Sequence, residues 1–265
     1  MGDFEHDTAV RAGADGSYDC EIHGDWWVVA GPNGGYLAAI IVRALESRAG
    51  PSDAGGPSRP LRSLTVHYLR VPAEGPARVE VALEREGRSV SFARARLVQD
   101  GRPCALALAV LADTRGGMEL EHAQAPAAAA PEEVEQPPDR PEAPRFAGQF
   151  DLRPAVGGPV FGAGTEALAG GWMRLRSECR LDAACLTALC DSWFPSVFSV
   201  TSEPIAVPTL ELTVHLRVSA PLPPDWVLGR FVTRTARDGL LEEDGEIYSR
   251  DGRLVAQSRQ LALAG

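Results

Sequence analysis

The sequence predicts an α+β fold of two tandem units, each with one buried helix followed by about four antiparallel strands that curl around it. Three observations lead to this prediction. The segment LTVHYLRVPA at 64–73 returns in nearly the same form as LTVHLRVSAP at 212–221. Two helix candidates are apolar on most of their faces, and the remaining ordered stretches alternate apolar and polar residues. A chain of 265 residues is long enough for two such units.

The repeat extends well beyond this strand. LVQDGRPCALALAVL at 97–111 is answered by YSRDGRLVAQSRQLALAG at 248–265, and a tryptophan-containing segment precedes each helix candidate. Self-similarity of this kind indicates two halves of the same order, residues 1–114 and 151–265. Residues 115–150 connect them. The central part of this connection has no aromatic residue, six prolines and a surplus of acidic side chains, which predicts a linker.

Each half contains one helix candidate. The first runs from roughly Asn33 to Glu46. The second follows Asp182, a typical N-cap residue, and its apolar residues recur at helical spacing: Leu186, Leu189, Cys190, Trp193, Phe194 and Val197. A helix that is apolar nearly all round is buried. This interpretation places Asp191 in the middle of the second helix.

The strands follow each helix. SVSFARARLV at 89–98 alternates between apolar and polar residues, and the DGR triplets at 100–102 and 251–253 are typical of hairpin turns. A sheet curled around one buried helix is the hotdog arrangement. The whole chain is therefore expected to be a double hotdog, in which the repeated segment is the first long strand after each helix.

Composition excludes several classes of function. The net charge of −10 argues against a nucleic-acid partner. All 26 basic residues are arginine, so chemistry that needs a lysine is absent. The five cysteines form no CxxC pair and are interpreted as reduced and structural, with no metal and no cofactor expected. The chain has no apolar run long enough to span a bilayer and no signal peptide at its start, which predicts a cytoplasmic protein.

Three polar residues of the second half are candidates for chemistry. Asp191 is a carboxylate in apolar surroundings, where burial without partners is costly. Thr209 opens the repeated strand and Gln260 lies in the last strand; alignment of the two halves places the apolar Leu61 and Ala109 at the equivalent positions. Only the second half therefore retains hydrogen-bonding groups at these places.

The chain resembles the acyl-CoA thioesterase II family of double-hotdog hydrolases over nearly all its length except the linker and the first dozen residues. The resemblance rests on the motifs GGYLAAIIVRAL, LTVHYLRVP, EGRSVSFARARLVQDGRP, LCDSWFPS and DGRLVAQSRQ. In that family an aspartate, a threonine or serine, and a glutamine orient the attacking water. The resemblance implies these roles for Asp191, Thr209 and Gln260, with an acyl-CoA thioester as substrate.

A thioesterase also needs a stabilised oxyanion, which backbone N–H groups at a helix start can provide. The start GPNGGYL offers Gly34, Gly35 and Tyr36 as candidates, although the glycines could equally serve close helix packing. His67 and His215 recur in both halves, which favours a structural role for them. The tryptophans are likewise expected to pack rather than to bind ligand.

Two alternative functions remain at this point. A hydratase of the same fold would need a histidine close to its aspartate, and Asp191 has none nearby in the sequence. A catalytically silent protein that binds acyl-CoA or an acyl carrier is the stronger alternative, because a fold does not determine a function. The open outer face of such a sheet also predicts a homodimer or a higher homo-oligomer.

Overall fold

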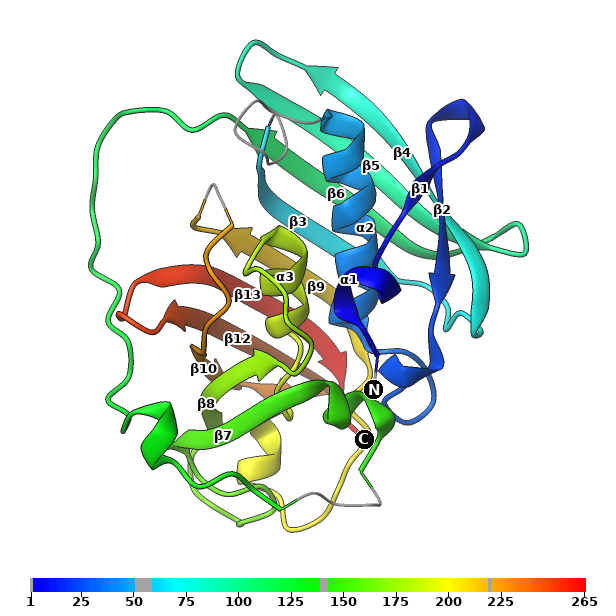
Figure 1. Cartoon of the computed structure of the whole chain (residues 1–265). Helices are drawn as coiled ribbons and strands as arrows, with labels where there is room; N and C mark the ends of the chain where they lie inside the picture. The colour runs from blue at the N-terminus through cyan, green and yellow to red at the C-terminus, as the bar shows by residue number, and fades with distance from the viewer. Residues whose placement is uncertain (1, 51–58, 139–142, 219–220) are drawn as a thin grey trace.

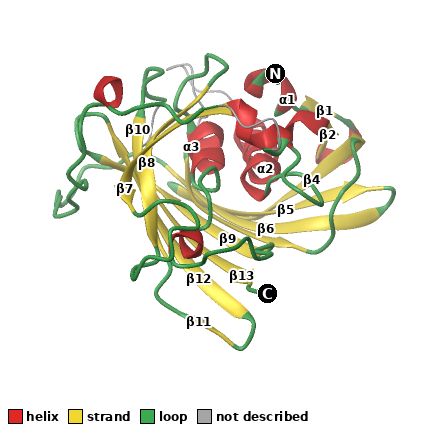
Figure 2. Cartoon of the chain, turned by 90° about the horizontal axis from the view of Figure 1, so that it is seen from below, coloured by secondary structure: helices red, strands yellow, loops and turns green. Residues whose placement is uncertain are grey.

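The computed structural model describes residues 2–50, 59–138, 143–218 and 221–265. Within these residues thirteen strands form one antiparallel sheet, in the order β1-β2-β4-β5-β6-β3-β9-β13-β12-β10-β8-β7, with β11 paired to β12 alone. The sheet curls around two central helices, α2 and α3, which lie side by side on its concave face (Figures 1 and 2). The predicted α+β double-hotdog architecture is confirmed.

Among the described residues of the first half there are two helices and six strands. Their bounds in chain order are α1 (Phe4–Asp7), β1 (Arg11–Ala12), β2 (Ser17–Ile22), α2 (Gly34–Ala49), β3 (Leu61–Tyr68), β4 (Gly75–Glu86), β5 (Val90–Gln99) and β6 (Arg102–Ala112). The short 3₁₀ turns η1 (Ala14–Gly16) and η2 (Gly24–Trp26) flank β2. Asp100 and Gly101 both have positive φ in the β5–β6 turn, as the DGR triplet predicts.

The described part of the second half repeats this order with one helix and seven strands. They are β7 (Phe150–Gly157), β8 (Leu168–Leu175), α3 (Ala183–Leu189), β9 (Thr209–Leu216), β10 (Val227–Val232), β11 (Ala236–Arg237), β12 (Leu240–Ser249) and β13 (Leu254–Leu263). Three further 3₁₀ turns are η3 (Pro131–Glu133), η4 (Arg145–Gln149) and η5 (Ser196–Ser199). In both halves two strands precede the central helix and the remaining strands follow it.

The two copies of the repeated strand join the halves. β3 pairs with β9 in antiparallel register, so that Thr65 lies opposite Thr213, and their hydroxyl oxygens are 2.9 Å apart. These two threonines, which occupy the same position in the repeat, thus meet at the centre of the sheet. The pairing satisfies two strand edges that separate units would leave open.

The central helices differ in length. Asn33 caps α2 by accepting a hydrogen bond from the Tyr36 amide, close to the predicted start. Asp182 caps α3 as predicted, but this helix ends at Leu189, and the prediction that it continues to Val197 is wrong. Pro195 supplies a reason, because proline cannot continue a helix and disfavours helical backbone in the residue before it.

The main core lies between the helices and the concave face of the sheet. Nearly every residue of α2 from Gly35 to Leu45 is buried, and so is α3 from Ala184 to Leu189, as expected for helices that are apolar nearly all round. Trp26 stacks on Tyr36 with ring centroids 4.9 Å apart, which confirms a packing role for this tryptophan. Among the described residues no helix is both long and apolar enough to cross a membrane.

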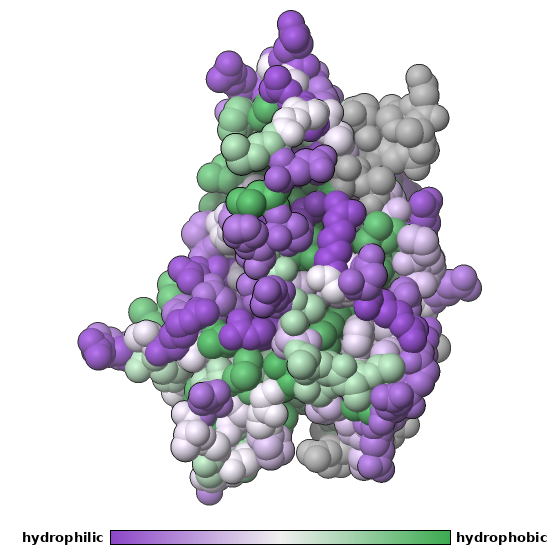
Figure 3. Space-filling model, turned by 90° about the vertical axis from the view of Figure 1, so that its left-hand side faces the viewer, coloured by the Kyte–Doolittle hydropathy of each residue, from purple (hydrophilic) through white to green (hydrophobic). Residues whose placement is uncertain are grey.

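The linker runs along the outer face of the second half, on the left in Figure 1. Its Ala123, Ala125, Ala128 and Val134 pack on a second apolar cluster that the sheet presents there: Trp172, Trp226, Leu228, Tyr248 and Leu254. The Trp172 indole also donates to the carbonyl of Ala129 at 2.7 Å. Hydrophobic and hydrophilic residues are interspersed on this side of the molecule (Figure 3). A segment too polar for a core of its own thus covers apolar surface of the second half.

Candidate functional site

Asp191 lies where the two central helices meet. It follows the end of α3 in a turn and is not inside the helix, so its predicted mid-helix position is wrong. Its Oδ2 accepts hydrogen bonds from the Asn33 side-chain amide at 2.9 Å and from the Gly35 backbone amide at 2.8 Å. The Asn33 amide also donates to the Asp191 carbonyl at 2.8 Å. The first turn of α2, in the first half, therefore holds the carboxylate of Asp191, in the second half.

Burial raises the pKa of the Asp191 carboxyl from its ordinary value to about 6, although hydrogen bonds from Gly35 and Gln260 favour the charged form. A carboxylate with a pKa in this range is ionised at neutral pH and yet basic enough to take a proton from a bound water. These properties suit a general base.

Thr209 and Gln260 meet on neighbouring strands. Thr209 is the first residue of β9, and its hydroxyl donates to Gln260 Oε1 on β13 at 2.9 Å. The Gln260 side chain is buried and also hydrogen-bonds to Asp191. The structure thus brings the three sequence-predicted residues into one hydrogen-bonded chain, although they come from three separate segments.

The predicted oxyanion group has other partners in this structure. The Gly35 amide donates to Asp191, and the Tyr36 amide donates to Asn33 Oδ1 at 2.8 Å. The Tyr36 hydroxyl points away, donating to the Asp7 carbonyl at 2.9 Å. Gly34 and Gly35 both lie against Asp191, because an added Cβ on Gly34 would stand 3.0 Å from Oδ2 and one on Gly35 2.8 Å from Cβ. Close helix packing and positioning of the carboxylate are the roles visible for these glycines.

Two site residues of the first half were missed by the sequence analysis. The sequence analysis used Asn33 only to mark the start of the first helix. The side-chain amide of an N-cap asparagine can also donate a hydrogen bond to a residue of a neighbouring helix or turn. Tyr68, at the end of β3, donates its hydroxyl to the Gly34 carbonyl at 2.7 Å. Burial, followed by the charge of Asp191, raises its pKa well above the ordinary value. The repeat held a signal for Tyr68, because the second copy has Leu216 at this position.

Glu243 was missed as well. It lies on β12 directly opposite Gln260, is buried, and accepts a hydrogen bond from the Ser196 backbone amide at 2.5 Å. The Ser196 hydroxyl in turn donates to Thr233 at 3.0 Å. Glu243 therefore ties the segment that follows Asp191 to the strand pair that carries Gln260. The alternation of β12 indicates only that Glu243 faces inward, since it occupies a position between Leu241 and Gly245 on the buried side.

Replacement of Glu243 by glutamine should reduce the pH dependence of stability. Burial raises the pKa of Glu243 from 4.5 to about 7, so the folded protein retains a proton that the unfolded chain has released. The free energy of unfolding contributed by this group therefore falls as pH rises from about 4.5 to about 7, by on the order of 3 kcal/mol. Urea denaturation at several pH values should show a smaller fall in Glu243→Gln than in the wild type.

The variant Glu246→Gln is the matched control, since Glu246 lies on the same strand and faces outward to Arg230. Its pH dependence should remain that of the wild type. An unchanged pH slope in Glu243→Gln would show that the buried carboxyl is ionised throughout this range.

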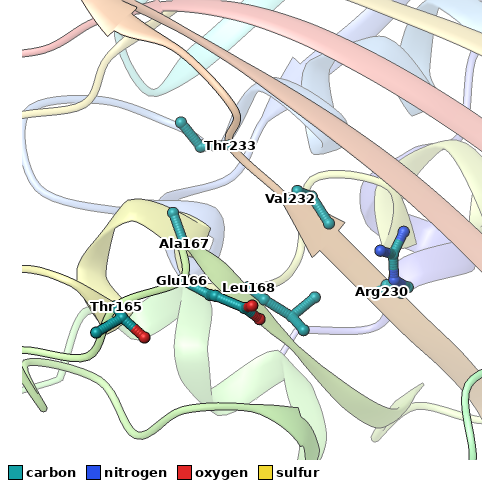
Figure 4. A pocket seen from close by; sticks show the side chains of 7 residues that line it. All are labelled: Thr165, Glu166, Ala167, Leu168, Arg230, Val232 and Thr233. Atoms are coloured by element: carbon teal, nitrogen blue, oxygen red, sulfur yellow. The ribbon is translucent and has the colours of Figure 1, made fainter.

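A cavity of about 260 Å³ lies in the second half, beside the start of β8 and the end of β10 (Figure 4). It is lined by the segment from Thr165 to Leu168 and by Arg230, Val232 and Thr233 of the β10 end. None of the three candidate catalytic side chains lines it. We predict instead that they face a substrate pocket reached from the start of α2.

The recurring histidines lie in strands, as expected. His67 is in β3 and His215 in β9, and both are exposed on the outer face of the sheet, away from the central helices. This position lies away from the buried candidate catalytic side chain of Gln260, and the structural role favoured by their recurrence stays a prediction. The five cysteines are all free.

Both halves of the chain match the sequence profiles of known protein families. Residues 23–112 match the sequence profile of the acyl-CoA thioesterase N-terminal domain, and residues 126–264 match that of the acyl-CoA thioesterase C-terminal domain. An uncharacterized protein of Mycobacterium tuberculosis is 27% identical over 269 residues, which cover 93% of this chain and 90% of that protein.

Solved structures agree in fold. A hot dog protein of unknown function from Alicyclobacillus acidocaldarius has a TM-score of 0.89 and 24% identity, covering 99% of this chain and 97% of that one. A putative thioesterase II from Thermobifida fusca has a TM-score of 0.86 and 24% identity, with 100% and 98% covered. The acyl-CoA thioesterase II TesB2 from Mycobacterium marinum has a TM-score of 0.78 and 20% identity, with 99% and 98% covered.

Proposed function

Since the chain belongs to the acyl-CoA thioesterase family, we propose that it hydrolyses acyl-CoA thioesters to a free fatty acid and CoA, using water activated at Asp191, Thr209 and Gln260. The observation that carries this proposal is the hydrogen-bonded chain from Thr209 through Gln260 to Asp191. A protein that only bound acyl groups would have no need of a basic carboxylate beside two groups able to orient water.

In the proposed reaction Asp191 removes a proton from water while the water oxygen attacks the thioester carbon. Oδ2 is held by Asn33 and Gly35, so we assign the proton to Oδ1. Thr209 and Gln260 fix the position of the water, which lowers the entropic part of the barrier. The tetrahedral intermediate then collapses, the C–S bond breaks, and the thiolate of CoA leaves and takes up a proton.

The oxyanion role of Gly34, Gly35 and Tyr36 remains part of the proposal. The amide of Gly35 already donates to Asp191, and the amide of Tyr36 already donates to Asn33. An incoming thioester oxygen would therefore have to compete with Asp191 or Asn33 for one of these N–H groups. A shift of this kind on substrate binding would couple the placement of the thioester to release of the carboxylate for catalysis.

Release of free thiol from a panel of acyl-CoAs of different chain length tests the proposed function. Turnover by the purified chain, with loss of turnover in an Asp191 variant, would support it. Binding of acyl-CoA without thiol release across the panel would instead favour the silent acyl-binding protein. Parallel assays with acyl-carrier-protein thioesters would identify the thiol carrier.

We further propose that the protein is a cytoplasmic homo-oligomer. Five free cysteines agree with a reducing compartment. The outer face of the first half leaves Phe92, Leu106 and Leu108 exposed, whereas the linker covers part of the corresponding face of the second half. Two copies related by a two-fold axis could bury this first-half face.

Light scattering should accordingly give a mass of at least twice the 28.2 kDa of one chain at micromolar concentration. Leu108→Asp, which places a charge on this face, should shift the mass toward one chain. A wild-type mass of a single chain would contradict the proposed assembly.

A further inference from the structure

A cluster of metal-ligating side chains lies near the start of the chain, apart from the candidate catalytic site. His6 and Asp7 belong to α1, and His23 follows β2. One ligand atom from each of the three lies within 4.8 Å of the other two. The sequence analysis expected no metal because the cysteines lack a ligand pattern; these ligands are instead two imidazoles and a carboxylate that the fold brings together.

The distances fit a small divalent ion. Asp7 Oδ1 lies 3.0 Å from His6 Nδ1 and 3.7 Å from His23 Nδ1. A tetrahedral ion with bonds of about 2.0–2.1 Å places its donor atoms roughly 3.4 Å apart. The two observed distances lie on either side of this value, so small side-chain rotations would bring all three atoms to one ion.

The carboxylate is held in place by the protein core. Asp7 is buried, and its Oδ2 accepts a hydrogen bond from the Trp26 indole at 2.9 Å, while Oδ1 is the oxygen nearest both imidazoles. Such a second contact, which orients a ligand, is typical of metal sites. The His6 side chain is 70% exposed and His23 26%, which leaves the metal an entry path and room for a water ligand.

We propose that His6, Asp7 and His23 bind one divalent first-row transition metal ion such as Zn²⁺ through two imidazole nitrogens and one carboxylate oxygen. The ion connects α1 to the segment after β2. The Tyr36 hydroxyl donates to the Asp7 carbonyl and accepts from the His23 amide at 3.1 Å, so the site is also linked to the first turn of α2. Metal binding should therefore stabilise the folded protein.

Calorimetric titration of the full chain with ZnCl₂, in protein without a histidine tag, tests the proposal. We expect one ion per chain with a micromolar or lower dissociation constant, and a higher melting temperature in the presence of zinc. His6→Ala and His23→Ala should each weaken binding by at least about tenfold and remove the thermal shift. His6→Ala should leave the melting temperature of the metal-free protein unchanged, since the ring is mostly exposed.

The matched control is His67→Ala, which removes another exposed histidine of the first half that lies in β3 and is not part of the cluster; this variant should bind zinc as the wild type does. X-ray absorption of the zinc complex should show two imidazoles and oxygen ligands at about 2.0–2.1 Å. Absence of stoichiometric binding at about 100 μM zinc, or wild-type binding by the His6→Ala/His23→Ala variant, would overturn the proposal. The cluster would then be a hydrogen-bonded salt link only.

Discussion

Replacement of Asp191 by asparagine should lower the turnover number for acyl-CoA by roughly 10²–10⁴-fold. Asparagine preserves the shape of the side chain and can still accept the hydrogen bonds of Asn33 and Gly35 through its oxygen, but it cannot take a proton from water. The fold should survive, because a buried charge is removed and not created. Thiol release and thermal melting of the same preparation measure both quantities.

The wild-type rate should also depend on pH in a defined direction. With a pKa of about 6, Asp191 is protonated below this value, so kcat/KM should fall about tenfold per pH unit under acidic conditions and level off above pH 6. In Asp191→Asn, kcat/KM should not show this fall at acidic pH. Wild-type turnover in Asp191→Asn would mean that another group activates the water.

Thr209→Ala and Gln260→Ala provide the internal comparison for Asp191. Each should reduce turnover less than Asp191→Asn, because the base remains. Their losses should not add in the double variant, since the Thr209 hydroxyl donates to the same Gln260 whose side chain contacts Asp191. Strictly additive losses would place the two side chains in separate roles.

Replacement of Gly35 by alanine should impair both folding and turnover. An added Cβ would stand 2.9 Å from the Ala188 carbonyl oxygen and 2.8 Å from the Asp191 Cβ, and neither the backbone nor a Cβ atom can move cheaply. Overpacking of this kind costs about 1–3 kcal/mol. Because the Gly35 amide also holds Asp191, we expect turnover to fall by roughly 10²-fold, the scale of a misplaced catalytic group.

Gly148→Ala is the control for this prediction. Its added Cβ would meet no atom within 4 Å, and the glycine does not require positive φ. Melting temperature and thiol release should both stay at wild-type values in the control. A Gly35→Ala protein with unchanged melting temperature and rate would mean that the two central helices can separate without loss, which contradicts the proposed holding of Asp191.

The sequence predicted local structure correctly where the residues of a single segment were enough to define a helix cap or the start of a strand. Asp182 and Asn33 cap helices close to where their residue types predict, and Thr209 opens its strand. The outcome was different at Asp191. Apolar residues continue at helical spacing past it, but Pro195 and the turn after Leu189 end the helix, since periodicity reports burial and not hydrogen bonding.

Residues that act together but come from separate segments could not be paired in advance. The alternating pattern around Glu243 indicates a strand but does not indicate that Glu243 lies opposite Gln260, because the pairing register depends on which strands become neighbours. The same holds for Asn33, whose partner lies 158 residues away, and for His23, which lies near Asp7 although β1 and β2 separate the two residues in the sequence.

By itself the sequence determined that the chain folds as two similar units, each a buried apolar helix with a curled antiparallel sheet, because hydrophobic period and repeat are local properties. It also singled out Asp191, Thr209 and Gln260 by residue type. Only the tertiary structure decided that β3 pairs with β9 and that the start of α2 from one half holds the carboxylate of the other. The physical reason is that hydrogen bonds between distant segments form only when packing brings their donors and acceptors within about 3 Å, and no pattern along the chain records that distance.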